Sequence, residues 1–232
     1  MNSTTDRSST PETASTTFSK SILVNDATLG KCRHVCAFFR TLDEHYRVLL
    51  PFIEEGFANS ERAFHIVNPT LRDDHRRRLT AAGIDVPDAE NRGQLIVRDW
   101  RDTYRREGRF DQQLMLATLE GALKDSIQSG FPMSRLICNM EWAAEDRPAV
   151  DDLLEYETRF NYVLVNYPDP VICTYDLSKF RADFVVDVMR THPMIIIGGI
   201  LQANPFFVAP DEFLRELRSR QTTRMSAPTF AS

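Results

Sequence analysis

The sequence lacks the features that would place the protein in a membrane or in an oxidising compartment. No apolar run approaches the roughly 18 residues that a membrane-spanning helix needs, and the run at 194–201 has only the length of a buried strand and its turn. The serine- and threonine-rich N-terminus has no apolar core of a secretory signal. The four cysteines form no C-x-x-C pair, and three lie in apolar runs, as buried thiols of cytosolic proteins do. We therefore expect a cytoplasmic protein that binds no membrane.

Signatures of common catalytic and nucleic-acid-binding machinery are also missing. The sequence has no G-x-S-x-G motif, no evident Ser/His/Asp set and no phosphate-binding G-x-x-x-x-G-K-[ST] loop. Its net charge of −5 argues against the broad basic surface of a protein that binds nucleic acid directly. We expect a protein that is not an enzyme, uses no cofactor and makes no direct contact with nucleic acid.

The pattern that is present is that of one α/β domain. Hydrophobic residues make up 42% of the 232 residues, enough for a packed core in one domain. Apolar runs alternate with stretches of helical periodicity, which predicts a mainly parallel sheet covered on both faces. The expected strands are 34–39, 63–67, 94–98, 135–140, 170–175 and 192–197. The expected helices are 43–59, 71–82, 110–130, 150–164, 183–190 and 211–220.

Composition sets the expected boundaries of this domain. Residues 1–20 are polar, rich in serine and threonine and have little to bury, which predicts a disordered N-terminal tail. Residues 221–232 have the same character and are expected to form a flexible C-terminal tail. The folded domain is expected to span 21–220.

The turn after the first strand is where a nucleotide-binding protein would hold phosphate. A phosphate-binding loop uses glycines to bring backbone N–H groups against the anion and a lysine to neutralise it. Here the turn at 40–45 reads Arg-Thr-Leu-Asp-Glu-His, with no glycine, no lysine and two acids that would repel a triphosphate. The strand–helix order of a nucleotide-binding protein is thus expected without its phosphate-binding loop, which favours a sensory role over catalysis.

Six groups of residues carry a resemblance to a known family. In chain order they are His34–Phe39; Pro51–Gly56 with Glu61–Val67; Tyr104 with Gly108–Asp111; Asn139–Trp142; Glu155–Glu157 with Asn161; and Cys173–Asp176 with Thr191–Pro193. Together, in this order, they resemble the MEDS domain, the sensory domain named after methanogens, methylotrophs and the repressor DcmR. The resemblance runs from about His34 to Phe207.

The resemblance implies a three-layer RecA/KaiC-like fold with a degenerate phosphate loop and a role in sensing small hydrocarbon-type molecules. Family members often carry a helix-turn-helix or a histidine-kinase module. We expect neither module here, because too few residues lie outside the core, and therefore expect a separate kinase or transcription factor as partner. Phe39 stands where the family commonly has tyrosine, so this chain lacks that hydroxyl group.

A small-molecule site is expected beyond the carboxyl ends of the central strands, where ligands of open α/β sheets bind. The first, fourth and fifth strands are neighbours in a RecA-like sheet, and the residues that follow them mix aromatic and polar groups. The candidate ligand-binding residues are Phe39, Arg40, Tyr104, Arg109, Glu141, Trp142, Tyr175, His34 and His192. Tyr104 and Arg109 are expected on a loop that closes over the site.

Structural alternatives stand beside these assignments. Core packing with a satisfied polar tip is the alternative for Trp142 and Tyr175. Glu141 follows an apolar strand, where an acid is costly unless it is paired. Its alternative is an ion pair with Arg109 or Arg40.

His34 and His192 have an alternative of their own. With Cys36 and Cys173 they would form a His/Cys metal set. Their alternation along strands, in place of a compact knuckle, favours buried histidines and thiols, so no metal is assigned.

Three hypotheses for function follow. The leading one is a non-catalytic sensory domain that binds a small ligand and signals to a kinase or transcription factor. The second is a metal- or redox-responsive sensor that uses the His/Cys set. The third is an enzyme, either a degenerate nucleotide-binding enzyme or a hydrolase with Glu141 as its base. The sequence also allows a homodimer.

Overall fold

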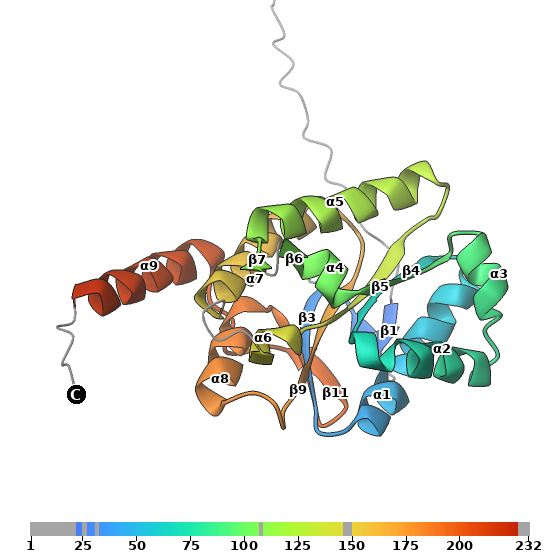
Figure 1. The fold of residues 1–232 in the computed structure, drawn as a ribbon, viewed down its shortest axis with the longest axis horizontal. Helices are drawn as coiled ribbons and strands as arrows, with labels where there is room; N and C mark the ends of the chain where they lie inside the picture. Colours follow the sequence, from blue (N-terminus) through green and yellow to red (C-terminus); the bar gives the residue numbers. More distant parts are fainter. Residues whose placement is uncertain (1–21, 25–26, 31–32, 107–108, 146–149, 227–232) are drawn as a thin grey trace, which may run out of the picture.

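The computed structural model describes residues 22–24, 27–30, 33–106, 109–145 and 150–226 (Figure 1). The N-terminal tail expected at 1–20 lies outside the described residues, as do 227–232. Helix α9 (Pro210–Ser226) extends past the boundary expected at 220, so residues 221–226 are helical and do not belong to a flexible tail.

Within the described residues, a seven-stranded sheet organises the domain. In spatial order its strands are β11 (Ile200–Ala203), β10 (Met194–Ile197), β3 (His34–Phe39), β9 (Val171–Asp176), β8 (Ser134–Asn139), β4 (Arg62–Val67) and β5 (Leu95–Asp99). Neighbouring strands pair in parallel, except that β11 is antiparallel to β10 at one edge. The expected mainly parallel sheet is confirmed, and β3, β9 and β8 are central neighbours, as a RecA-like sheet requires.

Helices cover both faces of the sheet and give three layers (Figure 1). One face packs against α1 (Leu42–Ala58), α2 (Arg72–Ala81), α3 (Val86–Asn91) and the hairpin of β1 (Ile22–Val24) and β2 (Ala27–Leu29). The other packs against α4 (Trp100–Tyr104), α5 (Gln112–Gln128), α7 (Val150–Leu164), α8 (Ala182–Thr191) and α9.

Strand β3 shows how the sequence supports both layers. Every residue of β3 is buried. Alternate residues of a strand point to opposite faces, so Val35 and Phe39 belong to the core under α1, whereas Cys36 and Phe38 belong to the core under α7. A strand that is apolar throughout therefore needs helices on both sides.

Short elements are the main difference from the sequence-based expectation. Besides β1, β2, β11, α3 and α4, these are the 3-10 helix η1 (Pro69–Leu71), β6 (Arg105–Arg106), β7 (Arg109–Phe110) and α6 (Trp142–Glu145). Segments of two to six residues carry too few positions for a periodic pattern to stand out. None of the helices among the described residues is long and apolar enough to cross a membrane.

Candidate functional site

A crevice of about 240 Å³ opens beyond the carboxyl ends of β3, β8 and β9, at the position expected for a ligand. In-register pairing brings these strand ends together, because Phe39 lies opposite Asp176 and Asn139 opposite Thr174. The crevice is lined by Phe39, Thr41, Leu42, His45, Leu71, Asn139, Glu141, Thr174, Tyr175, Asp176 and Lys179.

The turn between β3 and α1 uses its own side chains to satisfy its backbone. Thr41 caps α1 by accepting a hydrogen bond from the backbone N–H of Glu44 (3.1 Å). The carboxylate of Glu44 accepts from the backbone N–H of Arg40 (2.8 Å). This is close to a capping box, the T-x-x-E arrangement that satisfies free N–H groups at a helix start. These donors are therefore not available to a phosphate.

The wall of the crevice beside this turn is aromatic and uncharged at neutral pH. Phe39 stacks on His45 with ring centroids 5.0 Å apart. Burial, with a smaller contribution from the nearby Arg78, lowers the pKa of His45 to about 4. His45 therefore presents a neutral ring where a nucleotide-binding protein would present cation and amide groups.

The acidic groups of the crevice are paired. Glu141 accepts hydrogen bonds from Asn68 Nδ2 (3.0 Å) and from the ammonium group of Lys179. Lys179 is thus a partner of Glu141. Of the two partners that the alternative interpretation expected, Arg40 is not paired with Glu141, and the side chain of Arg109 lies outside the described part of the chain. Asp176 accepts from the backbone N–H (2.9 Å) and hydroxyl (2.6 Å) of Ser178. Sequence reasoning missed Lys179, which the strand-end rule does not select because it lies three residues beyond β9.

Tyr104 and Trp142 lie in the core and do not line the crevice. Both are fully buried, and their rings stack with centroids 5.1 Å apart. Phe110 also stacks on Trp142 at 4.7 Å, and the Tyr104 hydroxyl lies 3.5 Å from Met140 Sδ. The expectation of a closing loop is wrong for Tyr104, which belongs to helix α4.

Arg40 is not among the residues that line the crevice. Arg40 has an exposed side chain in the β3–α1 turn. The backbone of Arg109 pairs with Arg106 in the β6–β7 hairpin, and the side chain of Arg109 lies outside the described part of the chain.

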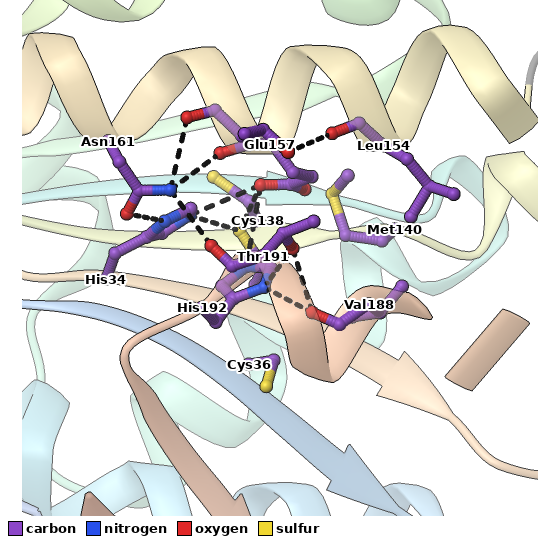
Figure 2. A network of polar contacts seen from close by, with 12 residues as sticks. His34, Cys36, Cys138, Met140, Leu154, Glu157, Asn161, Val188, Thr191 and His192 are labelled. Atoms are coloured by element: carbon purple, nitrogen blue, oxygen red, sulfur yellow. Dashed lines mark hydrogen bonds and ion pairs between the residues drawn. The ribbon is translucent and has the colours of Figure 1, made fainter. Parts of the chain in front are cut away.

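A group of polar side chains is buried on the face of the sheet that α7 and α8 cover, between β3, β9, α7 and the end of α8 (Figure 2). Nε2 of His34 lies 3.2 Å and Nε2 of His192 lies 3.5 Å from the same oxygen, Oε2 of Glu157. Sγ of Cys173 lies 3.8 Å from this oxygen and 3.8 Å from His34 Nε2. We call these four residues the His–Glu–Cys cluster; their ligand atoms all lie within 4.8 Å of one another.

Burial shifts the pKa values of the residues in this cluster. Burial, reinforced by His192, lowers the pKa of His34. Burial alone would raise the pKa of Glu157, but His192 and His34 outweigh it and bring that pKa to about 2. Burial raises the pKa of Cys173, which favours the thiol. Glu157 is therefore an ionised carboxylate within the cluster.

The structure brings together three of the four residues of the expected His/Cys set and replaces the fourth. Cys36 points elsewhere, with Sγ 3.6 Å from the carbonyl oxygen of Met194. Glu157 takes its place, and the sequence contained a signal for it. Glu157 lies three residues after Leu154 and three before Phe160 on the buried face of α7, where an acid needs partners.

Tyr175 connects the two regions. It is one of the residues at the crevice, and its buried hydroxyl donates a hydrogen bond to Glu157 Oε1 (3.2 Å). His34, Phe39, Glu141, Tyr175 and His192 thus lie where a ligand or an ion could be held, at two places joined by one residue.

Comparison with known proteins gives one match to a family over most of the chain. The family described as MEDS, MEthanogen/methylotroph, DcmR Sensory domain, matches residues 33–193, a span that includes the crevice and the His–Glu–Cys cluster. The transcriptional repressor DcmR of Methylorubrum extorquens (strain DSM 6343 / CIP 106787 / DM4) is 25% identical over 160 residues. The alignment covers 68% of this chain and 57% of the repressor, so the chain spans little more than half of that relative.

Solved structures also show similarity at low sequence identity. The KaiC-like protein PH0186 from Pyrococcus horikoshii OT3 is 14% identical with a TM-score of 0.48, over 69% of this chain and 68% of that chain. The flagellar accessory protein FlaH from Methanocaldococcus jannaschii is 13% identical with a TM-score of 0.44, over 77% of this chain and 81% of that chain.

Proposed function

Since the chain belongs to the MEDS family of sensory domains, we propose that it binds a small ligand in the crevice at the carboxyl ends of β3, β8 and β9. A sensory or regulatory role follows from the family and from the similarity to a transcriptional repressor. The observation that carries the ligand proposal is the crevice itself, which joins aromatic walls to a few polar groups at the position where open α/β sheets bind ligands.

The dimensions and lining of the crevice favour a very small ligand. Its volume of about 240 Å³ is below the roughly 300–1,000 Å³ of pockets for drug-sized molecules. Phe39, neutral His45 and Tyr175 would contact an apolar body, while Asn139 and Lys179 would orient one polar atom. A hydrocarbon derivative of a few non-hydrogen atoms fits this description.

We further propose that the domain acts without turnover. Catalysis of phosphate transfer needs donors that stabilise developing negative charge, and the N–H groups of Arg40 and Glu44 are already occupied. Glu141 is bonded to Asn68 and Lys179, which makes it a poor candidate for a general base.

The proposed signal passes from the crevice through Lys179 to helix α8. Lys179 is bonded to Glu141 and lies in the turn between β9 and α8. A ligand that competes for Lys179 would change the position of this turn and of α8, provided that it binds the two conformations with different affinity. The receiver is proposed to be a kinase or a transcription factor.

A thermal-shift screen of small halogenated, hydroxylated and carbonyl-containing hydrocarbons, with ATP and magnesium as a separate arm, tests the proposal. A ligand at a hundredfold excess over Kd stabilises the fold by about 2.7 kcal/mol. Asn139→Leu, which fills the crevice, and Glu141→Gln, which weakens its contact with Lys179, should reduce the shift. Glu155→Gln on the exposed side of α7 is the matched control and should leave it unchanged.

Two outcomes would contradict the proposal. A shift that persists in both crevice variants would place the ligand elsewhere. Release of phosphate from ATP at ordinary enzyme rates, about 1 s⁻¹ or faster, would overturn the non-catalytic assignment.

A further inference from the structure

The donor atoms of the His–Glu–Cys cluster converge from four separate segments of the chain. His34 begins β3, Glu157 lies in α7, Cys173 lies in β9, and His192 follows α8. The side chains of His34, Glu157 and His192 are 0–2% exposed, and Cys173 is equally buried. A charged group at such depth requires full compensation.

Hydrogen bonds fix the orientation of the His34 ring. The amide nitrogen of Asn161 donates to the carbonyl oxygens of Glu157 (3.1 Å), Thr158 (3.3 Å) and Thr191 (2.9 Å). The amide oxygen of Asn161 therefore faces Nδ1 of His34 at 3.1 Å and accepts a hydrogen bond from its N–H. In the neutral ring, Nε2 carries a lone pair that points at Glu157 and Cys173.

His192 is oriented in the same way. Its Nδ1 lies 2.7 Å from Thr191 Oγ1 and 3.0 Å from the carbonyl oxygen of Val188. With the Nδ1 proton directed at these oxygens, Nε2 is the ring nitrogen that can bind a metal. This Nε2 is fully buried and has no hydrogen-bond partner among the described residues. It faces Glu157 Oε2 at 3.5 Å, so a cation held between the two atoms would be bound by both.

We propose that His34, Glu157, Cys173 and His192 bind a divalent transition-metal ion, with Zn²⁺ as the preferred ion. Two imidazoles, a thiolate and a carboxylate are all donors that Zn²⁺ accepts, and four protein ligands form a closed site of the structural kind. Histidines that bind a metal through Nε2 commonly donate their other N–H to a carbonyl group, as both histidines do here. The inference concerns a site separate from the crevice and does not depend on the proposed function.

Distances and charge agree with this assignment. Zinc–ligand bonds of about 2.0–2.3 Å place the donor atoms of a tetrahedral site about 3.3–3.6 Å apart. Four contacts within the cluster span 3.2–3.8 Å. All donor atoms lie within 4.8 Å of one another, so binding would draw the remaining pairs closer. Binding forms four metal–ligand bonds and releases the Cys173 thiol proton to solvent, without electron transfer. Zn²⁺, one thiolate and one carboxylate then make a neutral unit, which a buried site favours.

The site would also stabilise one wall of the crevice. Glu157 Oε1 accepts from the Tyr175 hydroxyl (3.2 Å), and Tyr175 lines the crevice. An ion that fixes Glu157 would therefore fix Tyr175 as well.

Metal analysis of the full chain, purified without chelators and then dialysed against Zn²⁺, tests the inference. We expect about one zinc per chain. Replacement by Co²⁺ should give d–d absorption of a tetrahedral site together with a thiolate-to-cobalt charge-transfer band. Cys173→Ser should abolish that band, and His192→Ala should reduce the metal content. Cys36→Ala removes a neighbouring buried thiol outside the cluster and should leave both readouts unchanged.

Asn161→Leu tests whether Asn161 positions His34 for metal binding or only stabilises the fold. Loss of an outer hydrogen bond to a metal-binding histidine weakens binding by about 10–100-fold, and a competition titration against a zinc indicator measures this change. Wild-type protein that takes up no zinc, or cobalt-loaded wild-type protein without the charge-transfer band, would overturn the inference. These readouts use no organic ligand, so they stand apart from the screen that tests the crevice.

Discussion

Arg135 is a buried cation that is compensated on every side. Its Nε donates to Glu61 (2.6 Å), one Nη donates to the carbonyl oxygen of Phe52 (2.6 Å), and the other lies 2.7 Å from Glu55. The guanidinium also lies over the ring of Phe52 at 4.6 Å. Such a network contributes little net stability when it is complete. Removal of one partner, however, leaves a charge without compensation in the low-dielectric interior.

Glu61→Ala should therefore destabilise the fold by about 3–5 kcal/mol, measured by urea unfolding at pH 7. Glu155→Ala removes an acid from the exposed i,i+4 pair with Arg159 and should change the free energy of unfolding by less than about 1 kcal/mol. Equal effects of the two substitutions would contradict the account of Arg135.

Gly56 leaves room for the stem of the same arginine. A Cβ at Gly56 would lie 2.8 Å from Cδ and 3.0 Å from Nε of Arg135, whereas a Cβ at Gly121 in α5 would meet nothing within 4 Å. Gly56→Ala should destabilise by about 1–3 kcal/mol through overpacking. Gly121→Ala should stabilise by up to about 1 kcal/mol through helix propensity. Thermal unfolding of the two variants measures the difference, and a stabilised Gly56→Ala protein would refute the predicted clash.

At the residue scale, sequence reasoning located the crevice but not all of its lining. The strand-end rule selected Phe39, Glu141 and Tyr175, because each follows or ends an apolar strand. It could not tell that Trp142 turns into the core, because the direction of a side chain after a strand depends on the local helix α6. Glu157 was named only within the family resemblance and was not assigned to the His/Cys set, because its partners come from distant segments.

At the scale of elements, α9 is held to α8 by two arginines and one aromatic ring. Arg190 and Arg220 both pair with Glu216 and lie over Phe213, which is fully buried. Arg220 also pairs with Asp187 of α8. Single ion pairs at the surface contribute little stability, so the buried ring of Phe213 contributes most among these contacts.

Phe213→Ala should loosen α9 from the domain, because it removes the largest of its three buried apolar side chains and leaves Leu214, Leu217 and half-exposed ion pairs. We expect faster amide hydrogen exchange over 210–226 and a loss of about 3–5 kcal/mol if the helix and core unfold together. Arg218→Ala, on the exposed side of α9, should leave the exchange unchanged. Unchanged exchange in Phe213→Ala would show that the remaining contacts hold the helix.

Long elements could be predicted from the sequence and short ones could not. The expected strand 34–39 and helix 150–164 have the bounds of β3 and α7, because each carries an uninterrupted pattern. The three-residue strands β1 and β2 were missed, since their formation depends on packing against α1 and β11 more than on their own pattern.

At the scale of the whole molecule, buried histidines under α1 and α2 set the response to acid. The Tyr46 hydroxyl lies 2.7 Å from Nδ1 of His75, and Nε2 of His75 lies 2.9 Å from Nδ1 of His65. Burial, with nearby charge, lowers the pKa of His75 to about 4 and also lowers that of His65. The unfolded chain, with histidine pKa values near 6.5, binds more protons than the fold between about pH 4 and 6.5.

Stability should therefore be fully present above about pH 6.5 and decrease as the pH falls toward 4, by about 1.4 kcal/mol for each pKa unit of His75. Asp169 opposes this trend over part of the range, because burial raises its pKa to about 6. Urea unfolding at pH 7, 6 and 5 measures the slope. His75→Gln should flatten it, whereas an unchanged slope would assign the acid response to other groups.

The order of strands in the sheet could be predicted only through the family resemblance. Local patterns identify strands but not their neighbours, and the central sheet pairs β3 with β9, which lies far along the chain, as His34 does with Val171. The mainly parallel character followed from the hydrophobic pattern, because strands buried on both faces are apolar throughout and alternate with helices.

The capped turn at 40–45 bears on how the proposed receptor would treat nucleotides. A lysine grafted into this turn would add a positive charge, but Glu44 and Thr41 would still hold the backbone N–H groups of Arg40 and Glu44. In a domain that acts as the proposed non-catalytic receptor, the same turn would keep ATP, which is abundant in cells, from competing with a scarce signal.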